Sequence, residues 1–186
     1  MKKSILLLRI IFTILLICTF VYIYIYSSED GEKSSNKSKG IMYSVICVIK
    51  GTENVTQTEI DTLEPLLRKI AHFGIYTMSG IWSMCLMSTF FRGEEKSVED
   101  SISVDDKLIT RIKAGSKTVE FKRILISTII GFLYACSDEI HQLFSPGRSG
   151  KLIDVSIDTM GVLNGVLLVL LICKLYEIIR GYKKTK

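Results

Sequence analysis

The sequence has little proline, little histidine and no closely paired cysteines. Two of its 186 residues are proline and two are histidine. The five cysteines include no C-x-x-C pair, and four of them lie inside apolar blocks, where cysteine behaves as a small hydrophobic side chain. This composition excludes a collagen-like chain, a disordered chain and a disulfide scaffold, and it argues against a zinc framework.

Long hydrophobic runs dominate what is present. Hydrophobic residues make up 48% of the chain, and the mean hydropathy is +0.34. They gather in four blocks, residues 5–26, 70–91, 124–144 and 155–179, each close to the ~20 residues that a ~30 Å hydrocarbon layer requires. The first block lacks the small-residue cleavage site of a signal peptide. The sequence therefore predicts an all-α integral membrane bundle of four transmembrane helices, multi-pass in the cell membrane.

The charged residues predict the orientation. The net charge of +5 comes from basic residues at the chain ends and between the apolar blocks, the usual placement beside a membrane, so no nucleic-acid partner is expected. Lysine and arginine are more numerous on the side that holds both ends and residues 92–123. Both termini are therefore predicted to be cytoplasmic.

The blocks divide the chain into three predicted parts: an N-terminal membrane helix over 1–26, an extracytoplasmic loop over 27–65, and a helical membrane domain over 66–180 that contains a water-exposed cytoplasmic loop over 92–123. The extracytoplasmic loop opens with a polar stretch typical of a flexible linker. Residues 41–49 within it are apolar and β-branched, which is consistent with a strand or an interfacial segment. Pro65 is predicted in the first turn of the next helix, with Thr62 or Glu64 as a cap.

Ionisable residues gather at the ends of blocks two, three and four. With four crossings, parity places these ends on one side of the membrane, and the orientation makes it the outer side. Charged groups at this depth seldom face lipid, so we expect them to face one another in a binding site. The predicted ligand-binding residues are Lys69, His72, Tyr76, Asp138, Glu139, His141, Gln142, Arg148, Asp154 and Asp158, with Arg68 as a further candidate.

Two local patterns refine this site. The Pro146–Gly147 pair predicts a tight turn between blocks three and four, which would hold Arg148 over the acidic helix ends. Gly161 and Gly165 form a G-x-x-x-G pattern that lets another helix approach block four closely.

These residues resemble the VanZ-like family of small membrane proteins. The similarity lies in RKIAHFGIY at 68–76 and SDEIHQLFSPGRSG at 137–150, and it continues through Asp154, Asp158, Gly161 and Gly165. The resemblance covers about residues 66–172 and implies a helical membrane protein, whose namesake is associated with low-level resistance to the glycopeptide teicoplanin. Many relatives carry a glutamate where this chain has Ile75.

Three hypotheses for the function remain open. The first is a cell-envelope protein that modulates glycopeptide resistance through a polar site at the outer membrane face. It would act by binding the glycopeptide or by altering a lipid-linked cell-wall precursor, with membrane lipids as further partners. The second is a membrane-embedded hydrolase or transferase acting on a lipid phosphate, with His72, Asp138, Glu139 and His141 as catalytic candidates. The third is a structural or regulatory membrane partner. No cofactor is predicted; a divalent metal is an alternative, with the ligands His72, His141, Asp138, Glu139, Asp154 and Asp158.

Overall fold

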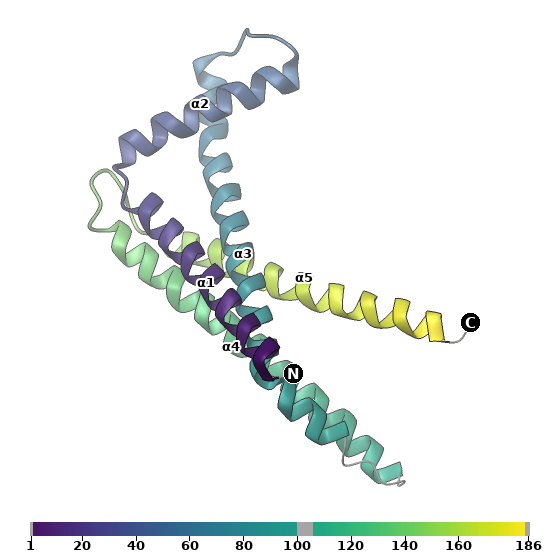
Figure 1. Cartoon of the computed structure of the whole chain (residues 1–186). Coiled ribbons are helices and arrows are strands. Elements are labelled where there is room, and N and C mark those ends of the chain that lie inside the picture. The colour runs from purple at the N-terminus through teal and green to yellow at the C-terminus, as the bar shows by residue number, and fades with distance from the viewer. Residues whose placement is uncertain (1, 100–105, 185–186) are drawn as a thin grey trace.

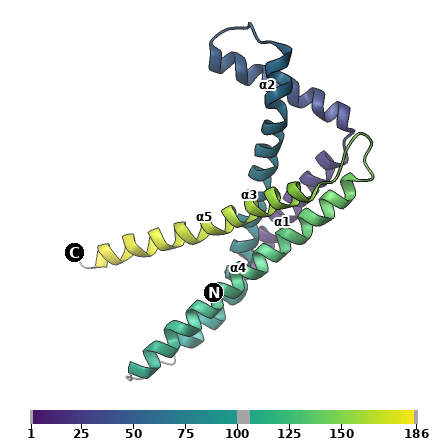
Figure 2. The same cartoon turned by 180° about the vertical axis from the view of Figure 1, so that it is seen from behind.

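A computed structural model describes residues 2–99 and 106–184 of the chain. Within these ranges the chain forms five helices joined by short turns and contains no strand, which confirms the all-α prediction. The helices are α1 (Lys2–Ser27), α2 (Gly31–Lys50), α3 (Gln57–Glu99), α4 (Asp106–Gln142) and α5 (Leu152–Lys184). Helices α1 and α4 lie side by side, α3 runs past them, and the C-terminal half of α5 extends away from the other helices (Figures 1 and 2).

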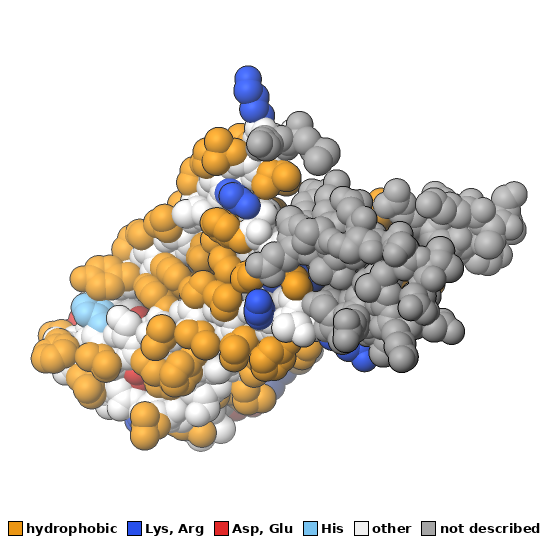
Figure 3. All heavy atoms as spheres, turned by 90° about the horizontal axis from the view of Figure 1, so that it is seen from below, with side chains coloured by type: hydrophobic (Ala, Val, Ile, Leu, Met, Phe, Trp, Pro, Cys, Tyr) orange, Lys and Arg blue, Asp and Glu red, His pale blue; other side chains and the backbone are white. Residues whose placement is uncertain are grey.

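Three helical segments are long and apolar enough to cross a membrane: Lys3–Ser27, Gln57–Phe91 and Leu152–Tyr176. Most of the predicted span over 124–144 lies in α4, which ends at Gln142 and is not among these three segments, so the count of four crossings and the orientation stay predictions. The outer surface is apolar: Leu6, Leu167 and Ile172 are each more than half exposed. Seen from below, hydrophobic side chains are spread over the described part of this face (Figure 3). This surface suits contact with lipid.

The predicted flexible linker and the predicted strand at 41–49 are wrong, because most of this region forms helix α2, whereas the alternative of an interfacial segment stays a prediction. The Asp30 carboxylate caps its N-terminus by accepting hydrogen bonds from the backbone N–H groups of Glu32 and Lys33. Gly51 ends it in the left-handed conformation, with φ of 66°.

The apolar residues of α2 follow helical spacing. Met42 and Ile46, four residues apart, are buried against Ile60 of α3, so this face of α2 packs on the neighbouring helix. The β-branched residues at 41–49 locally favour a strand, and tertiary packing overrides this preference here.

Pro65 does not lie in the first turn of α3, contrary to the prediction. The helix begins eight residues earlier, at Gln57. Thr56 and Glu59 form a capping box: the Glu59 carboxylate accepts from the Thr56 N–H at 3.0 Å, and the Thr56 hydroxyl accepts from the Glu59 N–H at 3.4 Å. Pro65 is therefore inside the helix.

The predicted cytoplasmic loop over 92–123 is largely helical. Helix α3 continues to Glu99, and α4 begins at Asp106. The loop prediction is therefore wrong for most of this region, which consists of the C-terminal end of α3 and the N-terminal part of α4. Residues 100–105 lie outside the described residues.

Glycines bring α3 and α5 into close contact, as the G-x-x-x-G pattern predicted. A Cβ atom on Gly165 would lie 2.1 Å from the Thr77 carbonyl oxygen, and one on Gly161 would lie 2.6 Å from that of Phe73. Gly80 of α3 makes the corresponding contact with α5, because a Cβ atom added there would lie 2.2 Å from the Val162 carbonyl oxygen. Backbone therefore meets backbone at this crossing, and side chains there have no room.

Candidate functional site

Three ionisable side chains from three helices meet beside the crossing. They are His72 of α3, Asp138 of α4 and Asp158 of α5, and one candidate ligand atom from each lies within 4.8 Å of the other two. We call this group the acid–histidine cluster. Asp138 is 4% exposed and Asp158 is 1% exposed, whereas the His72 side chain is 33% exposed. The two aspartates are thus in the protein interior, and the histidine connects them to the surface.

The two aspartates differ in their hydrogen bonding. The Gln142 amide donates to Asp138 Oδ2 at 3.1 Å and to Glu139 Oε1 at 3.0 Å, and the Lys151 N–H donates to Glu139 Oε2 at 2.8 Å. Neither oxygen of Asp158 accepts a hydrogen bond, and His72 Nδ1 lies 3.5 Å from Asp158 Oδ1. Asp158 is therefore the member of the cluster whose carboxylate lacks hydrogen bonds.

A cavity of about 190 Å³ adjoins the cluster. It is lined by charged side chains of both signs, including two members of the cluster. Its acidic residues are Glu64, Glu139, Asp154 and Asp158; its basic residues are Arg68, Lys69 and Lys151; His72 and Gln142 complete the polar lining. We call it the polar cavity. Most of the predicted ligand-binding residues therefore line one small space.

A larger cavity of about 950 Å³ lies between α1, α2 and α3. Its wall is mainly apolar and includes Ile23, Ile41 and Met78, while Arg68 and His72 belong to both cavities. We call it the amphipathic cavity. A molecule with an apolar tail and a charged head could place the tail here and the head at Arg68.

A family model described as VanZ/LLP1 matches residues 12–173. The chain belongs to the VanZ/LLP1 family. No curated protein and no solved structure matches it. Membership in this family, together with the three apolar helices, makes the chain a VanZ-like membrane protein and suggests an association with resistance.

Two of the residues within the VanZ-like motif do not join the cluster. His141 stacks on Tyr24 with ring centroids 4.6 Å apart, and its Nε2 lies 2.9 Å from the Ser28 hydroxyl, so it binds the end of α1. Tyr76 is fully buried next to the cluster, and its hydroxyl has no hydrogen-bond partner. His141, a predicted ligand-binding residue, thus contacts α1 and lies outside the cluster.

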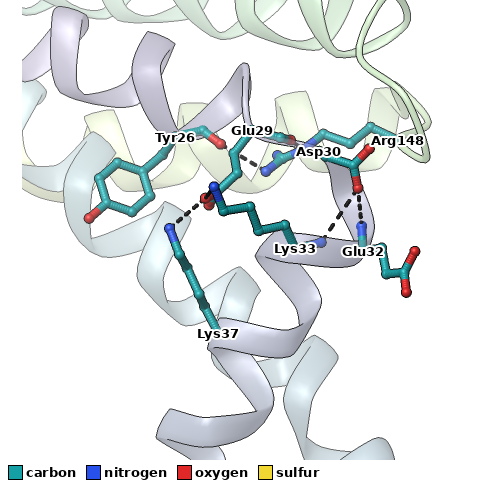
Figure 4. A network of polar contacts seen from close by, with 7 residues as sticks. All are labelled: Tyr26, Glu29, Asp30, Glu32, Lys33, Lys37 and Arg148. Atoms are coloured by element: carbon teal, nitrogen blue, oxygen red, sulfur yellow. Dashed lines mark hydrogen bonds and ion pairs between the residues drawn. The ribbon is translucent and has the colours of Figure 1, made fainter.

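Arg148 also contacts α1 and not the acidic helix ends. The turn predicted for this VanZ-like segment is present: Arg148 N–H donates to the Ser145 carbonyl at 3.2 Å, and Gly147 has φ of 69°. Arg148 Nη2 donates to the Tyr26 carbonyl at 2.8 Å, and Nε donates to the Glu29 carbonyl at 2.9 Å (Figure 4). The guanidinium therefore satisfies carbonyl groups at the end of α1.

We call the junction between α1 and α2, residues 26–30, the elbow. It also contains an ionic contact. The Glu29 carboxylate accepts a hydrogen bond from the Lys37 ammonium and lies 3.9 Å from that of Lys33 (Figure 4). The bond from Lys37 lowers the pKa of the Glu29 carboxyl below its usual value. Gly31 packs on the turn, because its N–H donates to the Pro146 carbonyl at 3.0 Å.

Replacing Arg148 by methionine is expected to loosen this elbow. The change removes two charge-assisted hydrogen bonds, each of which contributes about 1.5–3 kcal/mol. Hydrogen exchange at the Gly31 amide should then accelerate by about tenfold or more. Lys33→Gln is the matched control, because the Lys33 side chain is 69% exposed and should leave the exchange rate unchanged. Equal exchange in the Arg148→Met protein and the intact protein would contradict this role.

Ile75, the position at which the resemblance implies a glutamate, lies outside the cluster. Ile75 lines the amphipathic cavity and packs on the buried group around Tyr76 and Val162. The cluster therefore forms here from His72, Asp138 and Asp158 alone.

Sequence reasoning missed Glu64 as a lining residue. Glu64 is 6% exposed, lines the polar cavity, and lies 3.7 Å from Arg68 Nη1. It precedes Arg68 by four residues and His72 by eight, which places the three on one helix face. The helical spacing carries this signal once α3 is known to begin before Pro65.

Proposed function

We propose that this VanZ-family protein modulates the susceptibility of the cell envelope to glycopeptides such as teicoplanin, as a multi-pass protein of the cell membrane. In this proposal it binds an anionic amphiphile, either the lipid-bearing glycopeptide or a lipid-linked wall precursor. The apolar tail occupies the amphipathic cavity, and the anionic head contacts Arg68 and His72. The observation that carries the proposal is that these two residues belong to both cavities.

The charge of Arg68 supports this assignment. Its guanidinium approaches one carboxylate, that of Glu64, at 3.7 Å, which is longer than a hydrogen bond. Arg148 and Lys37, the other cations of the amphipathic cavity, already bind oxygen atoms of the elbow. Arg68 is thus the lining cation best able to bind a carboxylate or phosphate, to which its guanidinium can donate two parallel hydrogen bonds.

The apolar wall supports the tail. The amphipathic cavity has the volume of a typical ligand pocket, about 300–1,000 Å³. Gly74 lies on its wall, and a Cβ atom added there meets no atom within 4 Å. A large side chain at this position would therefore project into the cavity without disturbing the backbone.

Two variants test the proposal in a teicoplanin-susceptible host that expresses the protein at matched membrane levels. The intact protein should raise the inhibitory concentration of teicoplanin, and more so than that of a glycopeptide without a lipid tail. Arg68→Gln removes the charge for the head, and Gly74→Trp fills the space for the tail. Each should lose most of the protection, because one lost charged contact weakens binding by about tenfold or more.

Lys50→Gln is the matched control, since Lys50 lines neither cavity and pairs with Glu59 on the surface. It should protect as well as the intact protein does. Full protection by both Arg68→Gln and Gly74→Trp would refute the amphiphile site. Absence of any protection by the intact protein would refute the functional assignment itself.

A further inference from the structure

The acid–histidine cluster contains two buried polar groups with unmet bonding capacity. Asp158 is 1% exposed, yet neither of its oxygens accepts a hydrogen bond. The Tyr76 side chain has no exposed surface, its hydroxyl has no partner, and it interacts electrostatically with both Asp138 and Asp158. Buried carboxylates and hydroxyls are normally bonded, so each exception calls for a physical reason.

The spacing within the cluster fits ligands of one ion better than a direct hydrogen bond. His72 Nδ1 and Asp158 Oδ1 are 3.5 Å apart, beyond the usual range for an N–H···O bond. Two ligands bound tetrahedrally to one Zn²⁺ at about 2.1 Å are about 3.4 Å apart. Asp138 brings a third ligand atom within 4.8 Å of the other two. Small side-chain movements would bring all three around one centre.

The charges of the cluster also favour a divalent cation. When ionised, Asp138 and Asp158 together carry two negative charges, whereas a protonated His72 supplies one positive charge. The amide of Gln142, which donates a hydrogen bond to Asp138, carries no charge. A divalent ion would balance both carboxylates while His72 stays neutral, the form in which imidazole binds metals.

We propose that His72, Asp138 and Asp158 bind one divalent cation of the zinc or manganese class. Imidazole and carboxylate together suit these ions, whereas calcium and magnesium prefer ligand sets made wholly of oxygen. Three protein ligands leave a coordination position open toward the polar cavity, which His72 and Asp158 also line. This site goes beyond the amphiphile site proposed above, and neither proposal requires the other.

The test uses the full-length protein in detergent, purified without a histidine tag, stripped with a chelator and then titrated with Zn²⁺ or Mn²⁺. Elemental analysis after dialysis should find one ion per chain, and Ca²⁺ should not compete. Asp158→Asn and His72→Gln should weaken binding by at least about tenfold. Asp61→Asn is the control, because the Asp61 carboxylate pairs with Lys39 and lines neither cavity; this variant should bind like the intact protein.

An intact protein that retains no ion would overturn the proposal, and so would an Asp158→Asn protein that retains it as tightly. X-ray absorption of the zinc-loaded intact chain gives a readout that does not depend on how the variants fold. It should show oxygen and imidazole ligands. Sulfur ligands would place the ion on the free cysteines and would equally overturn the assignment.

Discussion

Replacing Gly165 by leucine is expected to separate helices α3 and α5 and to remove most of the folded protein from the membrane. The first side-chain atom would lie 2.1 Å from the Thr77 carbonyl oxygen and 2.8 Å from the Ile81 nitrogen. Both are backbone atoms, so the overlap can be relieved only by moving a helix. Overpacking costs about 1–3 kcal/mol where side chains can adjust, and we expect at least the upper value here.

This substitution should also abolish functions that depend on the cluster, because α3 carries His72 and α5 carries Asp158. Stability can be followed by thermal unfolding in detergent, and accumulation by immunodetection in membranes. Gly74→Ala is the control: a Cβ atom there meets nothing within 4 Å, and alanine is favoured over glycine in a helix by about 0.5–1 kcal/mol. A Gly165→Leu protein as stable as the Gly74→Ala protein would show that the crossing tolerates side chains.

Replacing His72 by leucine should destabilise the protein, and adding Asp158→Asn should restore much of the loss. In the metal-free protein a protonated His72 pairs with Asp158, with Nδ1 at 3.5 Å from Oδ1, and its removal leaves two buried carboxylates without this partner. Breaking a buried ion pair costs about 3–5 kcal/mol, and because the His72 side chain is 33% exposed, we expect a loss near the lower figure.

The second change removes the uncompensated charge, so the double variant should be more stable than His72→Leu alone. The four proteins form a double-mutant cycle that can be measured by unfolding in the presence of a chelator, which removes any contribution from bound metal. His141→Leu is a further control, because His141 pairs with Ser28 and not with an aspartate of the cluster; Asp158→Asn should not rescue it. Additive effects of His72→Leu and Asp158→Asn would mean that the two residues do not interact energetically.

The sequence predicts the features that depend on local patterns. Apolar blocks of spanning length, the turn at Pro146–Gly147 and the close approach at Gly161 and Gly165 can each be read from a few neighbouring residues. The meeting of His72, Asp138 and Asp158 requires the predicted topology as well. If the chain crosses the membrane four times, the polar ends of blocks two, three and four lie on the same side.

The features that the sequence did not predict depend on long-range partners. The side chain of Arg148 could serve carbonyl oxygens as well as carboxylates, and only the packed position of α1 selects the carbonyls of Tyr26 and Glu29. His141 similarly lies three residues from Asp138, yet its ring stacks on Tyr24 of α1 and does not join the cluster. Helix α2 was missed because its N-terminal half is polar and its apolar residues are β-branched, so neither half gave a helical signal alone.

Arg68 and His72 form a shared wall between the polar and amphipathic cavities, so two occupants could sense each other without touching. An anion that draws the His72 ring toward the amphipathic cavity removes an imidazole from Asp158, whereas a cation held at Asp158 fixes that ring. Thermodynamic reciprocity then requires each occupant to change the affinity of the other by the same factor. If both proposed sites bind their ligands, we expect this wall to couple the two binding equilibria.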